Sequence, residues 1–179
     1  VRYTVDIPAV DDTVTFTIAA GELADAHGTP GWEYVGTFVV DHPNIENYSA
    51  TNLPLQLLDD ATVTATIAVP NESATLIDLD VALDISHTWN ADLDVYLIAP
   101  NGTTVELFTD VGGSSSNFTG TVLDDEASMP IGWGSAPFTG YHRPEGSLSS
   151  FDGINPAGIW TLVVTDDVGW DTGTLNSWT

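Results

Sequence analysis

The stretch His87–Thr109, HTWNADLDVYLIAPNGTTVELFT, carries the clearest structural signal in this chain of 179 residues. Leu93, Val95 and Leu97 alternate with polar residues, and this period of two is typical of a strand with one buried face. A Pro-Asn-Gly turn separates this strand from a second one, Thr104–Phe108. We therefore expect an antiparallel hairpin that packs on a hydrophobic core.

Asp92 and Asp94 lie on the other face of the same predicted strand. Neighbouring like charges repel each other, and a bound cation removes that cost. Calcium takes about six to eight oxygen ligands from several loops, so acidic doublets elsewhere would complete a site if the fold brought them together. The predicted calcium ligands are Asp92, Asp94, Asp124, Asp125, Asp166 and Asp167. A second interpretation is that these residues are edge charges and turn caps of an acidic β protein.

The charge balance is strongly acidic, with 26 Asp and Glu against two basic residues and a formal net charge of −24. Nucleic acids and anionic membranes attract Lys and Arg, so neither is an expected partner. Adaptation to a saline medium is another explanation of the charge. The absence of cysteine excludes disulfides, zinc–thiolate sites and cysteine nucleophiles. With no initiating Met and no apolar run of about 18 residues, we expect a processed or excised segment without a membrane helix.

Strand signals dominate the rest of the chain, because runs rich in Val, Ile and Thr alternate with Gly, Pro, Asn and Asp. In Leu76–Ile85 every second residue from Ile77 to Ile85 is apolar and is expected to face the core. The predicted strands are Tyr3–Ile7, Thr13–Ala19, Tyr34–Val40, Thr62–Val69, Leu76–Ile85, Leu93–Ala99, Thr104–Phe108, Phe118–Leu123 and Ile159–Thr165. The fold class is therefore all-β, a jelly-roll β-sandwich.

We expect a partial β segment at residues 1–42, a linker at 43–58 and the main domain at 59–179. In the first segment, the block VTFTIAAGELADAHGTP followed by a strand resembles the C-terminal half of a bacterial immunoglobulin-like repeat. A sheet of only three strands is marginal on its own. The segment is therefore expected to pack on the main domain or to gain strands from another chain.

Several motifs after residue 72 occur together in a fixed order. They are His87 through Asp92-Leu-Asp94, Pro100-Asn-Gly-Thr103, Phe118, Asp124-Asp-Glu-Ala127, Pro144, Leu148-Ser-Ser-Phe-Asp-Gly153, Asn155-Pro-Ala-Gly-Ile-Trp-Thr-Leu-Val-Val-Thr-Asp166 and Gly173-Thr-Leu-Asn-Ser-Trp178. In this order they resemble the P domain (P/Homo B) that follows the catalytic domain of kexin-like proprotein convertases. The resemblance implies a jelly roll without catalytic residues that supports a neighbouring protease, or a module of a large bacterial secreted protein. No subtilisin-like domain precedes it in this sequence.

Two further motifs carry no catalytic signal. His27-Gly-Thr29 is similar to the active-site histidine motif of subtilisins, but a triad also needs a serine and an aspartate element that are absent here. Gly112-Gly-Ser-Ser-Ser116 lacks the lysine and the helix of a phosphate-binding loop. We interpret the first as a turn and the second as a flexible hairpin loop.

The six tryptophans fall into two groups. Trp89, Trp160 and Trp178 lie in or beside predicted strands and are expected in the core or on a sheet face. Trp32, Trp133 and Trp170 lie in glycine-rich loops. Exposed loop tryptophans stack on sugars or anchor protein interfaces, and we favour interface or loop packing.

The sequence thus predicts a non-catalytic, calcium-stabilised, extracellular module, of bacterial origin. Its first predicted role is structural, as a surface or filament-type subunit that self-associates by strand addition. The alternatives are an accessory P domain that stabilises a subtilisin/kexin-like serine protease, and a carbohydrate-binding module. The predicted partners are copies of itself, a neighbouring domain of a larger secreted protein, or a polysaccharide.

Overall fold

The computed structural model describes residues 12–22, 24–40, 45–70 and 75–179. The chain forms two compact units, Val1–Glu46 and Asn47–Thr179. In the first unit, β1 (Asp12–Ile18) and β2 (Tyr34–Val40) form a two-stranded antiparallel sheet. The side chains of Phe16 and Tyr34 pack on each other across it, with ring centroids 5.8 Å apart. The predicted strand Tyr3–Ile7 lies outside the described residues.

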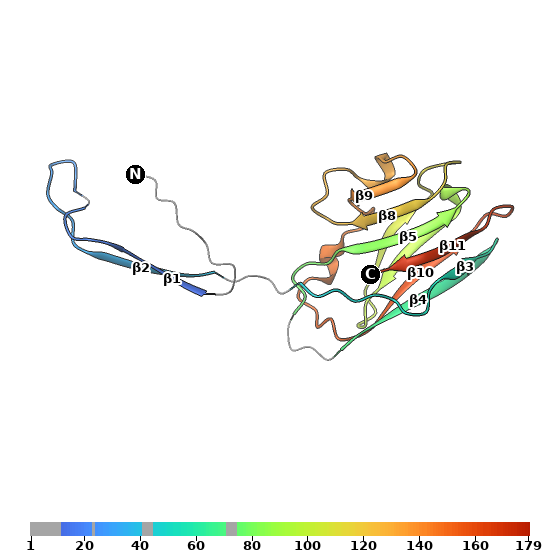
Figure 1. Cartoon of the computed structure of the whole chain (residues 1–179), viewed down its shortest axis with the longest axis horizontal. Helices are drawn as coiled ribbons and strands as arrows, with labels where there is room; N and C mark the ends of the chain where they lie inside the picture. Colours follow the sequence, from blue (N-terminus) through green and yellow to red (C-terminus); the bar gives the residue numbers. More distant parts are fainter. Residues whose placement is uncertain (1–11, 23, 41–44, 71–74) are drawn as a thin grey trace. The chain divides into compact units, whose positions relative to one another are not determined.

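The second unit is a β-sandwich of a four-stranded and a five-stranded sheet (Figure 1). The strand order is β4-β10-β6-β7 in one sheet and β3-β11-β5-β8-β9 in the other. The strands are β3 (Leu55–Leu57), β4 (Ala61–Val69), β5 (Val81–His87), β6 (Leu93–Ile98), β7 (Thr104–Thr109), β8 (Phe118–Leu123), β9 (Phe138–His142), β10 (Gly158–Asp166) and β11 (Gly173–Trp178). All neighbours are antiparallel except β8 and β9. The predicted all-β sandwich is confirmed.

The core lies between the two sheets and follows the period-two pattern of the sequence. Leu93, Val95 and Leu97 of β6 are buried, as predicted. A column of stacked aromatic rings joins the sheets. The ring centroid of Phe118 in β8 lies 4.5 Å from that of Phe108 in β7 and 4.9 Å from that of Phe138 in β9. Aromatic pairs at such distances add stability beyond the area that they bury.

The predicted hairpin of the quoted stretch forms as β6 and β7. Its Pro-Asn-Gly turn closes with the Gly102 N–H donating to the Ala99 carbonyl at 2.9 Å. Gly102 has a φ of 88°, a conformation that glycine adopts without steric cost. The Thr103 N–H donates to Asn101 Oδ1 at 2.9 Å, which fixes the turn further.

The prediction of one continuous strand over Leu76–Ile85 is wrong in its first half. Strand β5 begins only at Val81, and Ile77 is 67% exposed. The backbone of Leu76 instead pairs with the loop at Gly153 and Ile154, through two hydrogen bonds of 2.8 and 2.9 Å. The local alternation of apolar and polar residues does not show which partner the backbone takes.

Three strands of the sandwich were not predicted: β3, β9 and β11. Strand β3 has only three residues, β9 contains Gly140, and the pairing of β11 with β5 is shifted at a bulge. Shortness, an internal glycine and a bulge each weaken the strand signal in the sequence, because that signal depends on length and regular alternation. Strand β3 also lies inside the expected linker 43–58, so residues 47–58 belong to the larger unit.

Within the described part of the chain, no helix is long and apolar enough to cross a membrane.

Candidate functional site

The six predicted calcium ligands separate into two groups at opposite ends of β5. Asp166, which pairs with Leu93, ends β10 at the same end of the sandwich as His87, the last residue of β5. Asp124 follows β8, whose Leu123 pairs with Val81 at the start of β5. Strand β5 has seven residues, and at about 3.3 Å per residue its ends lie about 20 Å apart. One ion cannot be shared between the two groups.

A buried histidine–aspartate pair lies at the first of these ends. His87 Nε2 lies 3.0 Å from Asp166 Oδ2, and both side chains are fully buried. His87 Nδ1 lies 2.7 Å from the Trp89 carbonyl oxygen. The Trp89 N–H also donates to Nδ1 at 3.3 Å, so both ring nitrogens are engaged and the imidazole is fixed from two sides. The pair joins β5 of one sheet to β10 of the other.

Asp92 lies beside this pair, in the short 3-10 helix Asn90–Asp92. Its side chain is buried and makes no hydrogen bond with the described residues. Burial raises the pKa of the Asp92 carboxyl, and the negative charges of Asp166 and Asp171 raise the pKa further. The charged form of Asp92 is therefore held at a cost in the folded protein.

Asp94 lies on the outer face of β6, within a second acidic neighbourhood. Desolvation raises the pKa of the Asp94 carboxyl, and the negative charges of Asp167 and Asp110 make the largest electrostatic contributions. Glu106 and Glu145 add to the effect. Asp92 and Asp94 are thus both in repulsive surroundings, as expected from their spacing, but Asp92 lies in the 3-10 helix Asn90–Asp92 and only Asp94 lies in β6.

Asp125 has the opposite environment. Its carboxylate accepts hydrogen bonds from Ser147 Oγ at 2.8 Å, from the Leu148 N–H at 3.0 Å and from the Ser149 N–H at 2.9 Å. Desolvation opposes the charged form, but these donors outweigh it and hold the pKa of Asp125 below its usual value. Asp125 therefore fixes the turn Leu148–Phe151 as a cap. Asp124, next to it, accepts the Glu126 N–H at 2.6 Å.

The arrangement provides limited support for a metal site. Among the described residues, no group of three or more His, Asp or Glu side chains is arranged to hold a metal ion. Asp125 and Asp166 are occupied by protein donors. In the buried residues at this end, the oxygens left without donors are the Asp92 carboxylate and Asn90 Oδ1, which has no partner among the described residues. Calcium binding stays a prediction, and the Asp92 end of the sandwich is where it can be tested.

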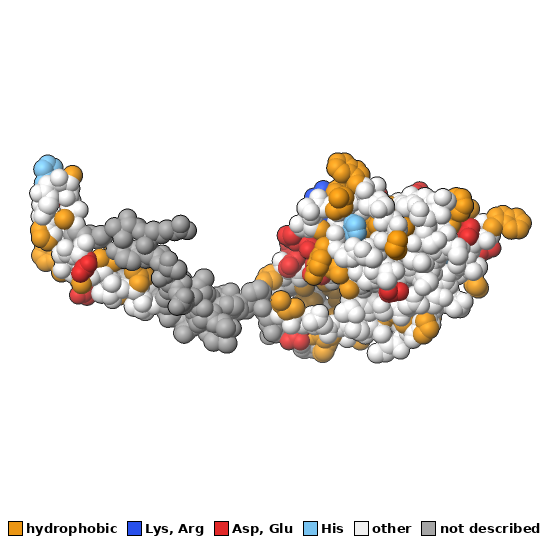
Figure 2. Space-filling view, turned by 45° about the horizontal axis from the view of Figure 1, so that its top comes forward, with side chains coloured by type: hydrophobic (Ala, Val, Ile, Leu, Met, Phe, Trp, Pro, Cys, Tyr) orange, Lys and Arg blue, Asp and Glu red, His pale blue; other side chains and the backbone are white. Residues whose placement is uncertain are grey.

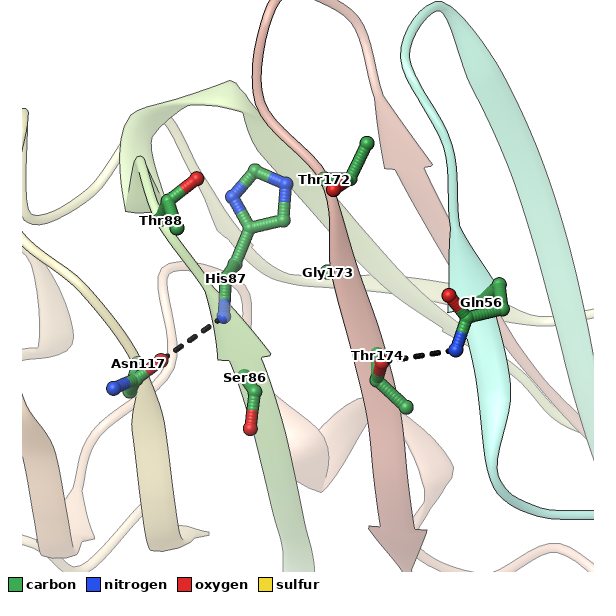
Figure 3. A pocket seen from close by; sticks show the side chains of 8 residues that line it. All are labelled: Gln56, Ser86, His87, Thr88, Asn117, Thr172, Gly173 and Thr174. Carbon is green, nitrogen blue, oxygen red and sulfur yellow. Dashed lines mark hydrogen bonds between the residues drawn. The ribbon is translucent and has the colours of Figure 1, made fainter.

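A polar groove of about 240 Å³ opens on the five-stranded sheet beside His87 (Figure 3). In this view the His87 ring extends toward Thr172, while Ser86 lies further along β5. The Thr174 hydroxyl accepts from Gln56 Nε2 at 3.2 Å, and Asn117 Oδ1 accepts from the His87 N–H at 3.1 Å. The residues that line the groove are Gln56, Ser86, His87, Thr88, Asn117, Thr172, Gly173 and Thr174.

Ser86 and His87 line the groove and the buried Asp166 contacts His87, but the three residues do not form a triad. A catalytic histidine needs one ring nitrogen free for the serine hydroxyl. Both nitrogens of His87 are engaged, one by Asp166 and one by the Trp89 carbonyl. Ser86 Oγ instead accepts from Asn176 Nδ2 at 2.9 Å. Consecutive strand residues also point to opposite faces, so Ser86 and His87 diverge.

The tryptophans divide much as the sequence predicts, with one correction. Trp160 and Trp178 are buried, but Trp89 is 44% exposed because it follows the end of β5 and is not part of a strand. Trp32, Trp133 and Trp170 are the most exposed, at 81–97%. Trp170 has a φ of 94°, a backbone conformation that a bulky residue rarely adopts.

The surface of the larger unit is acidic (Figure 2). Carboxylates occur in several patches on the visible face, and Arg143 is the one Lys or Arg among the described residues. Large apolar side chains project between these patches. The surface therefore offers apolar contacts and negative charge to a partner.

His87, Asn90 and Asn117 are the site residues that sequence reasoning missed. A signal for His87 was present, since it continues the buried alternation Val81, Leu83, Ile85. A histidine in an inward-facing position of a strand needs a buried partner. No comparable local signal marks Asn90 or Asn117, whose roles depend on contacts between loops.

A comparison with protein families identifies the family of the chain. The model of the proprotein convertase P-domain matches residues 76–179. The chain belongs to this family. P domains are non-catalytic accessory domains. This agrees with the contacts described above, in which His87 binds Asp166 and Ser86 binds Asn176.

Similar proteins include leupeptin-inactivating enzyme 1 of Streptomyces exfoliatus, which is 29% identical over 147 residues. That match covers 80% of this chain and 27% of the relative. Among solved structures, a serine protease of Aeromonas sobria matches with a TM-score of 0.40 and 16% identity over 76% of this chain and 27% of its own. The same protease in complex with its chaperone matches with a TM-score of 0.39 and 17% identity, over the same shares. The P-domain chain thus spans about a quarter of the length of these proteins.

Proposed function

We propose that this chain is the accessory P domain of a larger, secreted bacterial peptidase, in which it stabilises a neighbouring catalytic domain. The observation that carries the proposal is the family match over residues 76–179, the whole of the sandwich from Leu76 onward. A relative named as an enzyme, of which the chain covers 27%, supports a role as one part of a larger protein.

The construction of the sandwich supports a stabilising role. Its most polar interior contact, the pair of His87 and Asp166, ties the two sheets together and leaves no ring nitrogen for chemistry. Its exposed surface combines carboxylates with projecting tryptophans such as Trp170. Buried aromatic anchors surrounded by polar residues are typical of protein interfaces, so these tryptophans are the side chains that a catalytic domain would cover.

The family match favours this role over a filament-type subunit. Strand addition at the β1–β2 sheet remains an alternative, since that sheet has only two strands and exposes Tyr34 and Val35. Extracellular location fits the Streptomyces relative and the cysteine-free, acidic composition. A polysaccharide partner is supported by the groove of Figure 3 and by the exposed Trp170.

The proposal is tested on the secreted product of the gene that encodes this chain. Residues 47–179 are deleted, and the yield of folded protein and the half-life of peptidase activity at elevated temperature are compared with the intact product. The expected result is a lower yield and a half-life shortened about tenfold or more, since unfolding rates depend steeply on stability. An unchanged half-life and yield, or a product without peptidase activity, would refute the proposal.

A further inference from the structure

The two sheets of the larger unit have four edge strands, and three of these are protected. The free side of β7 is covered by residues Glu145 and Gly146, whose N–H groups donate to Leu107 and Glu106 at 3.0 and 2.9 Å. Strand β9 contains Gly140, and the segment 129–131 pairs with Arg143 directly after it. Strand β3 has only three residues. Covering, interruption and shortness are the usual protections of a sheet edge.

The fourth edge, β4, has none of these protections in the part of the chain that the structure describes. It is nine residues long, ATVTATIAV, and pairs with β10 in a continuous register from Ala61 to Val69 without a bulge. Within the strand there is no Pro, Gly or charged residue. Its other side carries no hydrogen bond to the described residues, and Figure 1 shows β4 at the margin of the sandwich. A long, regular and uncharged edge is a template for another strand.

The ends of this edge differ in charge. Asp59 and Asp60 are exposed immediately before β4, and Asp167 is exposed after Asp166, the partner of Ala61. The acidic end therefore lies at the N-terminus of β4, and the seven residues from Thr62 to Ala68 are neutral. A strand that pairs antiparallel to β4 places its own C-terminus beside these carboxylates.

We propose that β4 accepts an extended segment of a partner protein as an added antiparallel strand. The segment has alternating Thr and Val-type residues and one or two Lys or Arg at its C-terminal end. Side chains on one face of the added strand lie beside Thr62, Thr64 and Thr66, which are exposed, and those on the other face lie beside Val63 and Ile67 at the rim of the core. Backbone pairing supplies affinity and the basic end supplies orientation.

Charge argues against a second copy of this chain as the occupant. Each copy carries a net charge of −24, and two such surfaces repel each other at low ionic strength. A basic partner segment gains from the same field. A self-associated pair is accordingly one of the outcomes that the experiment below distinguishes.

The test uses the whole 179-residue chain and a labelled peptide, Val-Thr-Val-Thr-Val-Thr-Lys-Arg, with fluorescence anisotropy as the measurement. Saturable binding is expected at micromolar to sub-millimolar concentration. N-methyl groups are then placed on alternate residues, in either of two phases. In a strand, alternate N–H groups point to opposite sides, so one phase is expected to weaken binding about tenfold and the other to leave it within about twofold.

A peptide that ends in Asp-Glu in place of Lys-Arg is the matched control. It is expected to bind about tenfold more weakly at low salt, with the difference shrinking as the salt concentration rises. On the protein side, Thr64→Pro and Ala65→Pro remove neighbouring N–H groups, and only the one that faces outward is expected to fold normally and lose peptide binding. If neither variant folds, the two N-methylated peptides still show whether the peptide binds as an added strand.

Three outcomes would overturn the inference. They are no saturable binding up to about 1 mM peptide, equal binding of both N-methylated peptides, and a chain that sediments as a dimer which the peptide does not dissociate. Because the isolated chain is measured, these outcomes are independent of whether a peptidase domain is attached in the parent protein.

Discussion

Two aspartate doublets of similar sequence, Asp124-Asp125 and Asp166-Asp167, have different roles in the structure. Asp125 is surrounded by three donors from residues 147–149, and its pKa is lowered. Asp166 is fully buried, with His87 Nε2 3.0 Å from one carboxylate oxygen and the Val168 N–H 3.4 Å from the other, and its charge raises the pKa of the neighbouring Asp92. The comparison shows that the surroundings of a carboxylate, and not its spacing in the sequence, decide its role: Asp125 caps a turn, and Asp166 joins the two sheets through His87.

The largest expected effect is from breaking the buried pair. His87→Leu removes the side-chain partner of the buried Asp166 and leaves its charge uncompensated, so we expect the free energy of unfolding to fall by about 3–5 kcal/mol. For a domain of this size, that loss lowers Tm on the order of 10 °C. Urea unfolding of the wild-type and variant chains measures the change.

The double variant His87→Leu/Asp166→Leu is the matched control. Replacing both partners removes the unpaired charge, so most of the lost stability is expected to return. A single variant within about 1 kcal/mol of wild type would show that the pair does not hold the sheets together.

The second effect concerns the cap at the other end of β5. Asp125→Ala removes the acceptor of Ser147, Leu148 and Ser149, and we expect a loss of about 1–3 kcal/mol, because two backbone N–H groups lose their partner. Asp152→Ala, at an exposed carboxylate after the same turn, is the control and should change stability by less than about 0.5 kcal/mol. Equal effects of the two substitutions would remove the distinction between capping and surface carboxylates.

Unlike the preceding substitutions, Asp92→Asn is expected to increase the stability of the fold. The substitution removes a charge that burial and Asp166 disfavour, so Tm in EDTA should rise slightly. Thermal melts in calcium and in EDTA also test the predicted metal site. If calcium raises the Tm of the wild type but not of Asp92→Asn, Asp92 is a ligand; if calcium changes neither, the acidic residues act without an ion.

The pH dependence of stability should show both environments. Because the pKa of Asp92 is raised in the folded state, protonation favours folding, and stability rises as pH falls from above that pKa toward 3.8. Because the pKa of Asp125 is lowered, its contribution is present above 3.8 and is lost as pH falls below 3.8. Asp92→Asn should flatten the first limb and Asp125→Asn the second. A variant that leaves its own limb unchanged contradicts the assignment for that residue.

Much of the fold could be predicted from the sequence, because burial of one strand face makes apolar and polar residues alternate along the chain. The strands at Tyr34–Val40 and Phe118–Leu123 have their predicted bounds. The error at Leu76–Ile85 and the missed strand β3 have a common cause, since which backbone pairs with which is a property of the tertiary fold.

The candidate site was harder to predict for the same reason. The acidic residues were all visible in the sequence, and the spacing Asp92-x-Asp94 does place two carboxylates in repulsive surroundings. The donors were not visible, since Asp125 takes them from residues 22 to 24 positions away and Asp166 from a histidine 79 positions away. Long-range partners therefore decided the role of each carboxylate.

The most direct test of the proposed accessory role is heat inactivation of the parent protein with wild-type sequence and with His87→Leu. If the P domain stabilises a catalytic domain, loss of peptidase activity should coincide with unfolding of the sandwich, and His87→Leu should lower both midpoints by the same number of degrees. Activity that survives above the melting temperature of the sandwich, and that His87→Leu does not shift, would contradict the account.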